Sequence, residues 1–355
     1  MRAASGLEPS SFTWLGRADS LEERLVTSAG LPFAPISAAP LVGRGVLGKL
    51  LSMGSLGRGL WQAWRLAGRR RPNGVLVTGG YVSVPVALAA WLRRIPMTIY
   101  LPDIQPGRAV RFLARFAQRI AVTSMAAEQW LPARKLVVTG YPTRPALRNA
   151  DRAAARHSLS LGADDQLLLV FGGSQGSRRI NLALAAAAPR LLEVCHIVHV
   201  SGTLDMRAAE AARAALPETL RGRYHLHAYL DSPDMALALA AADLAVCRAG
   251  AASLGELPAR GLPAVLVPLP ISGGHQWPNA RQLEAAGAVE VLADADCDGP
   301  GLAAIVLRLL SEPVRLAAMA QASRSLDRPD AAAAIWAVVL QSLPLGSHRA
   351  QGEAR

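Results

Sequence analysis

Short runs of β-branched and other apolar residues alternate along the chain with longer segments rich in Ala, Leu and Arg. This alternation is typical of parallel sheets whose strands are joined by crossover helices. It predicts a first series of strands at 11–16, 74–79, 97–102, 119–124 and 135–140. A second series is predicted at 166–173, 195–202, 223–230, 243–250, 263–270 and 288–294. The stretch between the two series is polar and turn-rich, with Pro142 and Pro145. We therefore expect an α/β protein with two doubly wound domains.

The composition narrows the class of protein. With 355 residues, 51% of them hydrophobic and 18% charged, the chain is expected to form packed cores rather than a disordered region. No apolar stretch reaches the roughly 18–20 residues that a membrane span requires. The first residues also lack the charged-then-apolar order of a signal peptide, so we expect a soluble, cytoplasmic protein. Cys195, Cys247 and Cys297 are widely separated and are interpreted as buried thiols.

The net charge of +12 suggests an anionic partner, which could be a nucleic acid, a phospholipid surface or a phosphorylated substrate. Residues 41–72 mix Leu and Trp with Arg and Lys, a composition that suits anionic lipid headgroups. A predicted helix after Pro106 adds one stripe of arginines, namely Arg108, Arg111, Arg115 and Arg119. The alternative is an ordinary solvated basic face. Nucleic acid is disfavoured as a partner, because the basic residues lie among apolar ones and no nucleic-acid motif is present.

Two predicted strands end in glycine-rich turns that lead directly into helices. One contains Gly79 and Gly80, followed by Tyr81; the other contains Gly172, Gly173, Ser174 and Gly176. Such turns let the backbone approach a phosphate while the N-terminus of the next helix points its N–H groups at the anion. The alternative is plain tight-turn geometry, which is more plausible for the first turn than for the second.

The segment 243–284 carries further polar groups at two consecutive strand ends. A strand is predicted to end at Arg248-Ala249-Gly250, the small residues 251–253 then open a helix, and Glu256 falls near its first turn. Glu256 could simply interact with the helix dipole, or it could accept both hydroxyls of a ribose. After the next strand, Gln276 and Asn279 bring amides suited to sugar hydroxyls. These residues together favour a nucleotide-sugar site.

With these motifs, the chain resembles the MurG family of glycosyltransferases. The motifs concerned are TGGYVSVP, TGYPTRP, FGGSQGSRRIN and the long stretch from CRAGAASLGELPARG to HQWPNARQLEAAG. The resemblance implies a GT-B fold, with two Rossmann-like domains facing across a cleft. It also implies inverting transfer of GlcNAc from UDP-GlcNAc to undecaprenyl-pyrophosphoryl-MurNAc-pentapeptide (lipid I), at the cytoplasmic face of the membrane. No cofactor or metal ion is implied.

The resemblance implies a role for each matching residue. Arg144 and Ser174 are expected to contact the donor, and Leu230 to meet the uracil through its backbone. The diphosphate and ribose would lie on Ala251, Ala252, Ser253, Leu254, Gly255 and Glu256, with Glu256 on the ribose hydroxyls. Gln276 and His275 would hold the GlcNAc. The expected domains are an acceptor and membrane-associating domain at 1–145 and a UDP-sugar domain at 165–328. A helix at 329–345 is expected to pack back on the first domain, and a tail follows at 346–355.

The chain departs from the family pattern in its first domain. Its first residues correspond to the end of the family's first helix, so the preceding strand and Gly-Gly-His turn have no counterpart in the sequence. The general base is therefore unidentified, and Asp103 in YLPDIQPG is a candidate. Histidines 196, 199, 225 and 227 lie in predicted strands and are interpreted as packed or hydrogen-bonded rather than catalytic. Two alternatives remain open: a transferase for another lipid acceptor, such as diacylglycerol, and a UDP-GlcNAc-binding chain without turnover.

Overall fold

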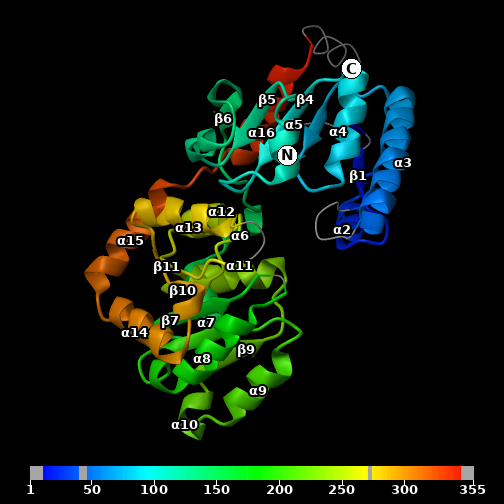
Figure 1. The fold of residues 1–355 in the computed structure, drawn as a ribbon. Coiled ribbons are helices and arrows are strands. Elements are labelled where there is room, and N and C mark those ends of the chain that lie inside the picture. The colour runs from blue at the N-terminus through cyan, green and yellow to red at the C-terminus, as the bar shows by residue number, and fades with distance from the viewer. Residues whose placement is uncertain (1–10, 40–45, 163, 174, 271–273, 345–355) are drawn as a thin grey trace. The chain divides into compact units, whose positions relative to one another are not determined.

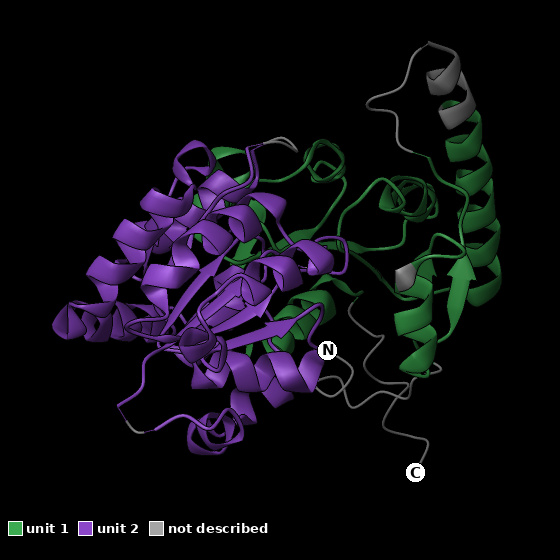
Figure 2. Ribbon diagram, turned by 90° about the horizontal axis from the view of Figure 1, so that it is seen from below, with its two compact units in different colours: residues 1–139, 330–355 green, residues 140–329 purple. Residues whose placement is uncertain are grey.

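The computed structural model describes residues 11–39, 46–162, 164–173, 175–270 and 274–344. The chain divides into two compact units, which Figure 2 shows in different colours. Unit 1 comprises residues 1–139 and 330–355, and unit 2 comprises residues 140–329. The tail expected at 346–355 lies outside the described residues.

Unit 2 is built on a six-stranded parallel sheet in the order β12-β11-β10-β7-β8-β9 (Figure 1). The strands are β7 (Leu167–Phe171), β8 (His196–Val200), β9 (Tyr224–His227), β10 (Leu244–Cys247), β11 (Ala264–Leu266) and β12 (Val289–Val291). The first strand, β7, lies between β8 and β10, so the chain winds away from it in both directions. In such sheets a crevice forms at the carboxyl ends of the strands, where the winding reverses.

Helices connect and cover the strands of unit 2. They are α6 (Pro145–Asn149), α7 (Arg152–Ser158), α8 (Arg178–Leu191), α9 (Met206–Ala214), α10 (Glu218–Arg221), α11 (Ser232–Ala241), α12 (Ser253–Arg260), α13 (Gln276–Ala285), α14 (Gly299–Leu310) and α15 (Pro313–Ser325). Because the sheet is covered, β7 and β10 are buried at nearly every position. This explains why their sequences are continuous apolar runs rather than alternating ones. The three cysteines are buried free thiols, as predicted.

Unit 1 contains a four-stranded parallel sheet in the order β3-β4-β5-β6 and a separate parallel pair, β1-β2. These strands are β1 (Trp14–Gly16), β2 (Phe33–Pro35), β3 (Val75–Val77), β4 (Met97–Leu101), β5 (Arg119–Val122) and β6 (Leu136–Val138). Its helices are α2 (Leu21–Ser28), α3 (Val46–Arg70), α4 (Ser83–Leu92), α5 (Arg108–Leu113) and α16 (Ala331–Ser342). From the far end of the sequence, α16 packs Ile335 and Val338 against Tyr100 and Ala121 of the sheet. None of the helices described is long and apolar enough to cross a membrane.

Every strand predicted from the apolar runs is present, which confirms the α/β fold of parallel sheets. The predicted arginine stripe after Pro106 is wrong in its second half. Helix α5 ends at Leu113, and tighter turns follow as Phe116 N–H donates to the Leu113 carbonyl. Arg119 then begins strand β5, because Gln118 N–H already pairs with Met97 of the neighbouring strand. Only Arg108 and Arg111 lie on the helix.

Candidate functional site

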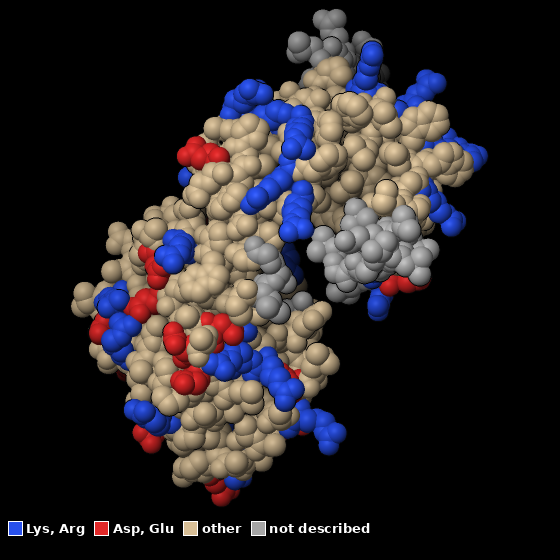
Figure 3. Space-filling view, viewed as in Figure 1, with Lys and Arg blue, Asp and Glu red and all other residues tan. Residues whose placement is uncertain are grey.

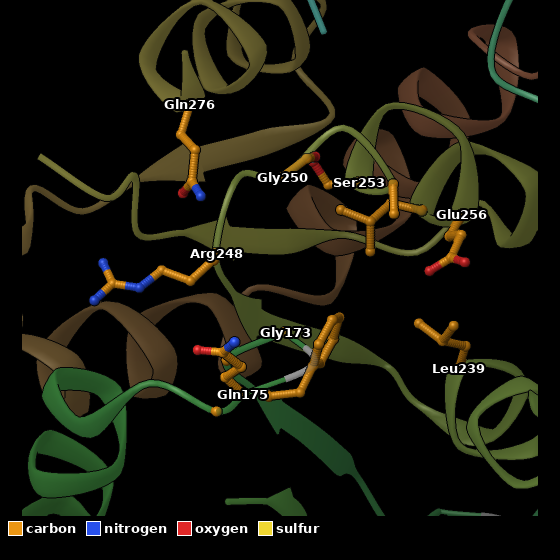
Figure 4. Close-up of a pocket in the computed structure, with 13 residues that line it drawn as sticks. Gly173, Gln175, Leu239, Arg248, Gly250, Ser253, Glu256 and Gln276 are labelled. Carbon is orange, nitrogen blue, oxygen red and sulfur yellow. The ribbon is translucent and has the colours of Figure 1, made fainter. Parts of the chain in front are cut away.

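A cavity of about 300 Å³ opens in unit 2 where the winding of the sheet reverses. Its walls come from the turns that follow β7, β10 and β11 and from helices α11 and α12 (Figure 4). The lining residues are Phe171, Gly172, Gly173, Gln175, Gly176, Leu239, Arg248, Gly250, Ala252, Ser253, Glu256, Leu257 and Gln276. The cavity therefore brings together both sequence segments that were singled out for a nucleotide sugar.

The turn after β7 requires glycine for physical reasons. A Cβ on Gly172 would collide with the backbone N–H of Ser177, at the turn into α8. Gly176 has a φ of +77°, and a Cβ there would meet the carbonyl of Ser201. Without side chains, the turn brings the backbone to the cavity wall and leads into the N-terminus of α8. Ser174, a predicted donor contact, lies outside the described residues.

The turn after β10 brings the first turn of α12 to the cavity. The Ser253 hydroxyl donates to the carbonyl of Gly250 at 2.6 Å and fixes this turn. Ala252, Ser253 and Glu256 line the cavity. Leu254 is buried, and Gly255 faces the Tyr141 ring, where a Cβ would lie 2.6 Å from a ring carbon. These two predicted residues thus pack the helix in place behind the cavity wall.

Glu256 places a carboxylate on the cavity wall, at the end occupied by Leu239 (Figure 4). Arg144, which precedes α6, donates from Nη2 to Glu256 Oε1 at 3.4 Å. Burial raises the pKa of Glu256, and the charge and hydrogen bond of Arg144 oppose this rise. Arg144 is 61% exposed and Glu256 only 19%, so the pair is accessible from the Arg144 side. A half-paired carboxylate of this kind can accept two hydroxyl groups.

Arg248 lines the opposite end of the cavity and was not among the predicted site residues (Figure 4). Its Nη1 contacts Asp294 at 2.5 Å and the carbonyl of Val267 at 3.1 Å. Its Nε donates to the Ser177 hydroxyl at 3.0 Å, and so it links the turns after β7 and β10. Its position directly after a buried strand was the only signal in the sequence.

The remaining residues of unit 2 that were predicted to bind the donor do not all line the cavity. Gln276 points its amide into the cavity, while its Oε1 accepts from the Leu269 N–H at 2.9 Å (Figure 4). Asn279, expected to bind a sugar hydroxyl, is instead fully buried, and its Nδ2 donates to the Ala249 carbonyl at 3.1 Å. Its physical role is to hold the turn after β10. Three further residues are outside the cavity wall: Ala251, His275 and Leu230, which lies between β9 and α11.

In unit 1, the other predicted glycine turn follows β3 and leads into α4. Gly79 and Gly80 have φ angles of +105° and +79°, which L-residues rarely adopt. Tyr81 accepts a hydrogen bond from Arg17 Nη1 at 3.4 Å through its hydroxyl. Asp103 follows β4, the neighbour of β3, so it lies at the same carboxyl edge as the two glycines. The structure therefore groups these four residues at one edge of the sheet of unit 1.

The chemistry of the cavity in unit 2 suits a nucleotide sugar. It combines glycine turns, two helix N-termini, a guanidinium, an amide and a carboxylate. Helix N-termini favour a diphosphate, whereas the carboxylate and amide favour hydroxyls; the guanidinium is already paired with Asp294. Among the residues that the structure describes, no group of three His, Cys, Asp or Glu side chains could hold a metal ion.

Comparison with known proteins agrees with this interpretation. Residues 167–335 match the glycosyltransferase family 28 C-terminal domain, and residues 6–122 match the N-terminal domain of the same family. The chain is 43% identical to a UDP-N-acetylglucosamine–N-acetylmuramyl-(pentapeptide) pyrophosphoryl-undecaprenol N-acetylglucosamine transferase of Roseiflexus sp., over 91% of this chain and 81% of the relative. It is also 43% identical to the Salinibacter ruber transferase of the same name, over 95% of this chain and 90% of the relative.

Among solved structures, MurG of Acinetobacter baumannii superposes with a TM-score of 0.72 at 26% identity. The match covers 93% of this chain and 90% of that one. The fold, the domain matches and the close relatives agree with one another. The chain therefore belongs to glycosyltransferase family 28 and, within it, to the MurG family of N-acetylglucosamine transferases.

Proposed function

We propose that the protein transfers GlcNAc from UDP-GlcNAc to N-acetylmuramyl-(pentapeptide) pyrophosphoryl-undecaprenol, with inversion at the anomeric carbon. The observation that carries this proposal is the cavity at the reversal point of the unit 2 sheet, with Glu256 on its wall. The relatives at 43% identity carry the name of this reaction. The product is the lipid-linked disaccharide of peptidoglycan synthesis.

The donor is assigned to unit 2. The diphosphate would lie between the turn at 172–176 and the start of α12, where two helix dipoles converge. Glu256 would accept the ribose hydroxyls, with Arg144 orienting the carboxylate from its exposed side. Gln276, with His275 beside it, would hold the GlcNAc. The backbone near Leu230 would meet the uracil, and Ser174 would add a contact to the donor.

The acceptor is assigned to unit 1. A base removes the proton of the acceptor hydroxyl, the oxygen attacks the anomeric carbon, and the bond to the UDP oxygen breaks. The helix N-termini of unit 2 would stabilise the charge that develops on the departing UDP. Asp103, at the same edge as Gly79 and Gly80, is the candidate base. An Asp103→Asn variant is expected to bind UDP-GlcNAc normally and to lose most of its turnover.

Unit 1 also carries the surface proposed to meet an anionic membrane. It contains 20 Lys and Arg against 8 Asp and Glu, whereas unit 2 contains 18 of each sign, so the net charge of +12 belongs to unit 1. Figure 3 shows many basic and few acidic side chains over the elements of unit 1 that face the viewer. Exposed aromatic rings lie among the arginines: Trp61, Trp64, Trp91 and Phe112 are 40–56% exposed.

The rings and arginines of this surface contact one another, and we call them the basic-aromatic surface of α3, α4 and α5. The Arg93 guanidinium lies 4.0 Å from the Trp64 ring centre, and Arg65 lies 5.3 Å from that of Trp61. Trp61, Arg65 and Arg69 also border a cavity of about 310 Å³ beside the end of β2. Amphipathic rings with adjacent cations suit the interface between headgroups and acyl chains.

A transfer assay tests the proposal. Radiolabelled UDP-GlcNAc is supplied with a lipid I analogue or with diacylglycerol, and the lipid products are separated. The proposal expects label in the lipid I product only. Label in the diacylglycerol product would show that the proposed acceptor is wrong and the proposed donor is right. Binding of UDP-GlcNAc without transfer to either lipid would contradict the assigned activity for this chain.

A further inference from the structure

A chain of polar side chains runs through the core of unit 2, beneath the glycine turn of the cavity. Tyr224 on β9, His199 on β8 and Asn181 on α8 are 3%, 1% and 8% exposed. The Tyr224 hydroxyl lies 2.8 Å from His199 Nδ1, and His199 Nε2 lies 2.9 Å from Asn181 Oδ1. Polar groups buried to this extent are costly unless every one is paired in a fixed geometry.

The hydrogen bonds of Asn181 determine where the protons lie. Its Nδ2 donates to the Ser201 carbonyl at 2.8 Å and to Asp205 Oδ2 at 3.0 Å, both of which only accept. Its Oδ1 must therefore accept, so His199 carries its proton on Nε2. His199 Nδ1 in turn accepts from the Tyr224 hydroxyl. One neutral tautomer of His199 satisfies every group in the chain.

Asn181 lies in the first turn of α8, which follows the glycine turn, and its side chain reaches the turn after β8. The Asn181 N–H donates to the Ser177 carbonyl at 2.9 Å, where the turn ends. The Ser201 carbonyl, held by Asn181 Nδ2, lies directly against Gly176, and Gly202 lies against the Gln175 carbonyl, which a Cβ would approach to 2.6 Å. Gly176 and Gly202 both have positive φ angles, +77° and +82°. The two turns thus interlock, and Asn181 joins them.

We propose that Tyr224, His199 and Asn181 are positioning residues for the donor site. They fix the turn at 201–202 against Gln175 and Gly176 and so keep these two residues in the position proposed to receive the diphosphate. None of the three lines the cavity, so they act through the turn rather than on the ligand. The identity of the ligand in this inference rests on the proposed function. The contact between the two turns is independent of it.

The test compares two histidines on the same strand. His199→Phe keeps a ring but breaks both hydrogen bonds, and Tyr224→Phe removes only the donor to Nδ1. His196→Phe is the matched control, because His196 begins β8 at the far end from the turn. Hydrogen–deuterium exchange of the unliganded chain is measured over 172–180, a segment that excludes Leu167, the strand partner of His196. Affinities for UDP and for uridine, which lacks the diphosphate, are measured by calorimetry.

We expect His199→Phe to speed exchange in the turn about tenfold and to weaken UDP binding about tenfold, with uridine binding unchanged. Tyr224→Phe should change the exchange rate and the UDP affinity in the same direction but by less. His196→Phe should change neither quantity. Equal exchange in the His199 and His196 variants would overturn the inference, as would parallel losses of UDP and uridine affinity. If the unaltered chain binds no UDP, the proposed function fails, while the exchange experiment still decides whether these residues hold the turn.

Discussion

The proposed donor site places Glu256 against the ribose of the nucleotide. The Glu256 carboxylate lines the cavity and accepts a hydrogen bond from Arg144 at 3.4 Å. Phosphates would be repelled by this negative charge, whereas neighbouring hydroxyls on a ribose can donate to both carboxylate oxygens. The assignment therefore concerns the sugar of the nucleotide, and it can be separated experimentally from phosphate binding.

Glu256→Gln should lower the affinity for UDP about tenfold or more, because a charged acceptor becomes a weaker neutral one. In the unaltered chain, 2′-deoxy-UDP should bind more weakly than UDP, and this difference should vanish in the variant. Calorimetry with both ligands measures the coupling, with Glu284→Gln on the exposed side of α13 as the control. If the Glu256→Gln variant still bound UDP more tightly than 2′-deoxy-UDP, the proposed ribose contact would be refuted.

His199 should make the protein sensitive to acid. Burial lowers its pKa from 6.5 to about 4, with the Asp205 charge partly opposing the shift. Between these values the unfolded chain binds more protons than the folded protein, so stability falls as pH falls from 6.5 to 4, by up to about 3 kcal/mol. Chemical denaturation at pH 7 and pH 5 measures the loss. The His199→Phe variant should lose less stability over this interval, and equal slopes in the two proteins would refute the assignment.

The strands were predictable from the sequence because a sheet covered on both faces needs continuous apolar runs. Leu167–Phe171 and Leu244–Cys247 are such runs, and the family resemblance rests on the turns that follow them. The short strand β2 was missed, since Phe33–Pro35 offers only three residues and ends in proline. The prediction of an arginine stripe was wrong in its second half. The arginines keep a helical spacing in the sequence as far as Arg119, but the helix itself ends at Leu113.

The site was predictable in part. Glycines 172, 173 and 176, together with Ala252, Ser253, Glu256 and Gln276, line the cavity, in keeping with their positions near strand ends. Arg248 lines the cavity although no site role was predicted for it, whereas Asn279, predicted to bind a sugar hydroxyl, is buried. Sequence position gives the edge of the sheet on which a residue lies, but the direction of its side chain depends on tertiary packing.

The glycine turn gives a prediction about one element. Gly176→Ala should destabilise the protein by at least about 1–2 kcal/mol, because an L-residue must adopt a left-handed φ and its Cβ would meet the Ser201 carbonyl. Gly250→Ala is the control on the same cavity, since a Cβ there meets nothing within 4 Å. Thermal unfolding measures both. A Gly176→Ala protein as stable as Gly250→Ala would contradict the interlocked turns.

The molecule as a whole separates its charges. Unit 2 is balanced, which suits a cavity whose selectivity depends on a few placed groups, whereas unit 1 carries the entire excess of +12. Such an excess beside exposed tryptophans attracts an anionic surface, and at physiological salt this attraction reaches only about 8 Å. The basic-aromatic surface should therefore act at short range and depend on salt.

The double substitution Trp61→Ser and Arg65→Ser should lower the fraction of protein that sediments with phosphatidylglycerol vesicles several-fold. It removes an exposed ring and its adjacent cation. The matched control is Leu204→Ser with Arg207→Ser, an exposed apolar and basic pair on unit 2. Vesicles of phosphatidylcholine alone should retain little of either protein. Equal losses in the two double variants would contradict the proposal that this surface meets an anionic membrane.

The account depends most directly on whether unit 2 binds the donor, and calorimetric titration of the full chain with UDP-GlcNAc measures this. We predict one site per chain, with a dissociation constant between about 1 μM and 1 mM, and competition by UDP. The absence of heat at millimolar donor, or binding that UDP does not displace, would contradict the assignment of the cavity.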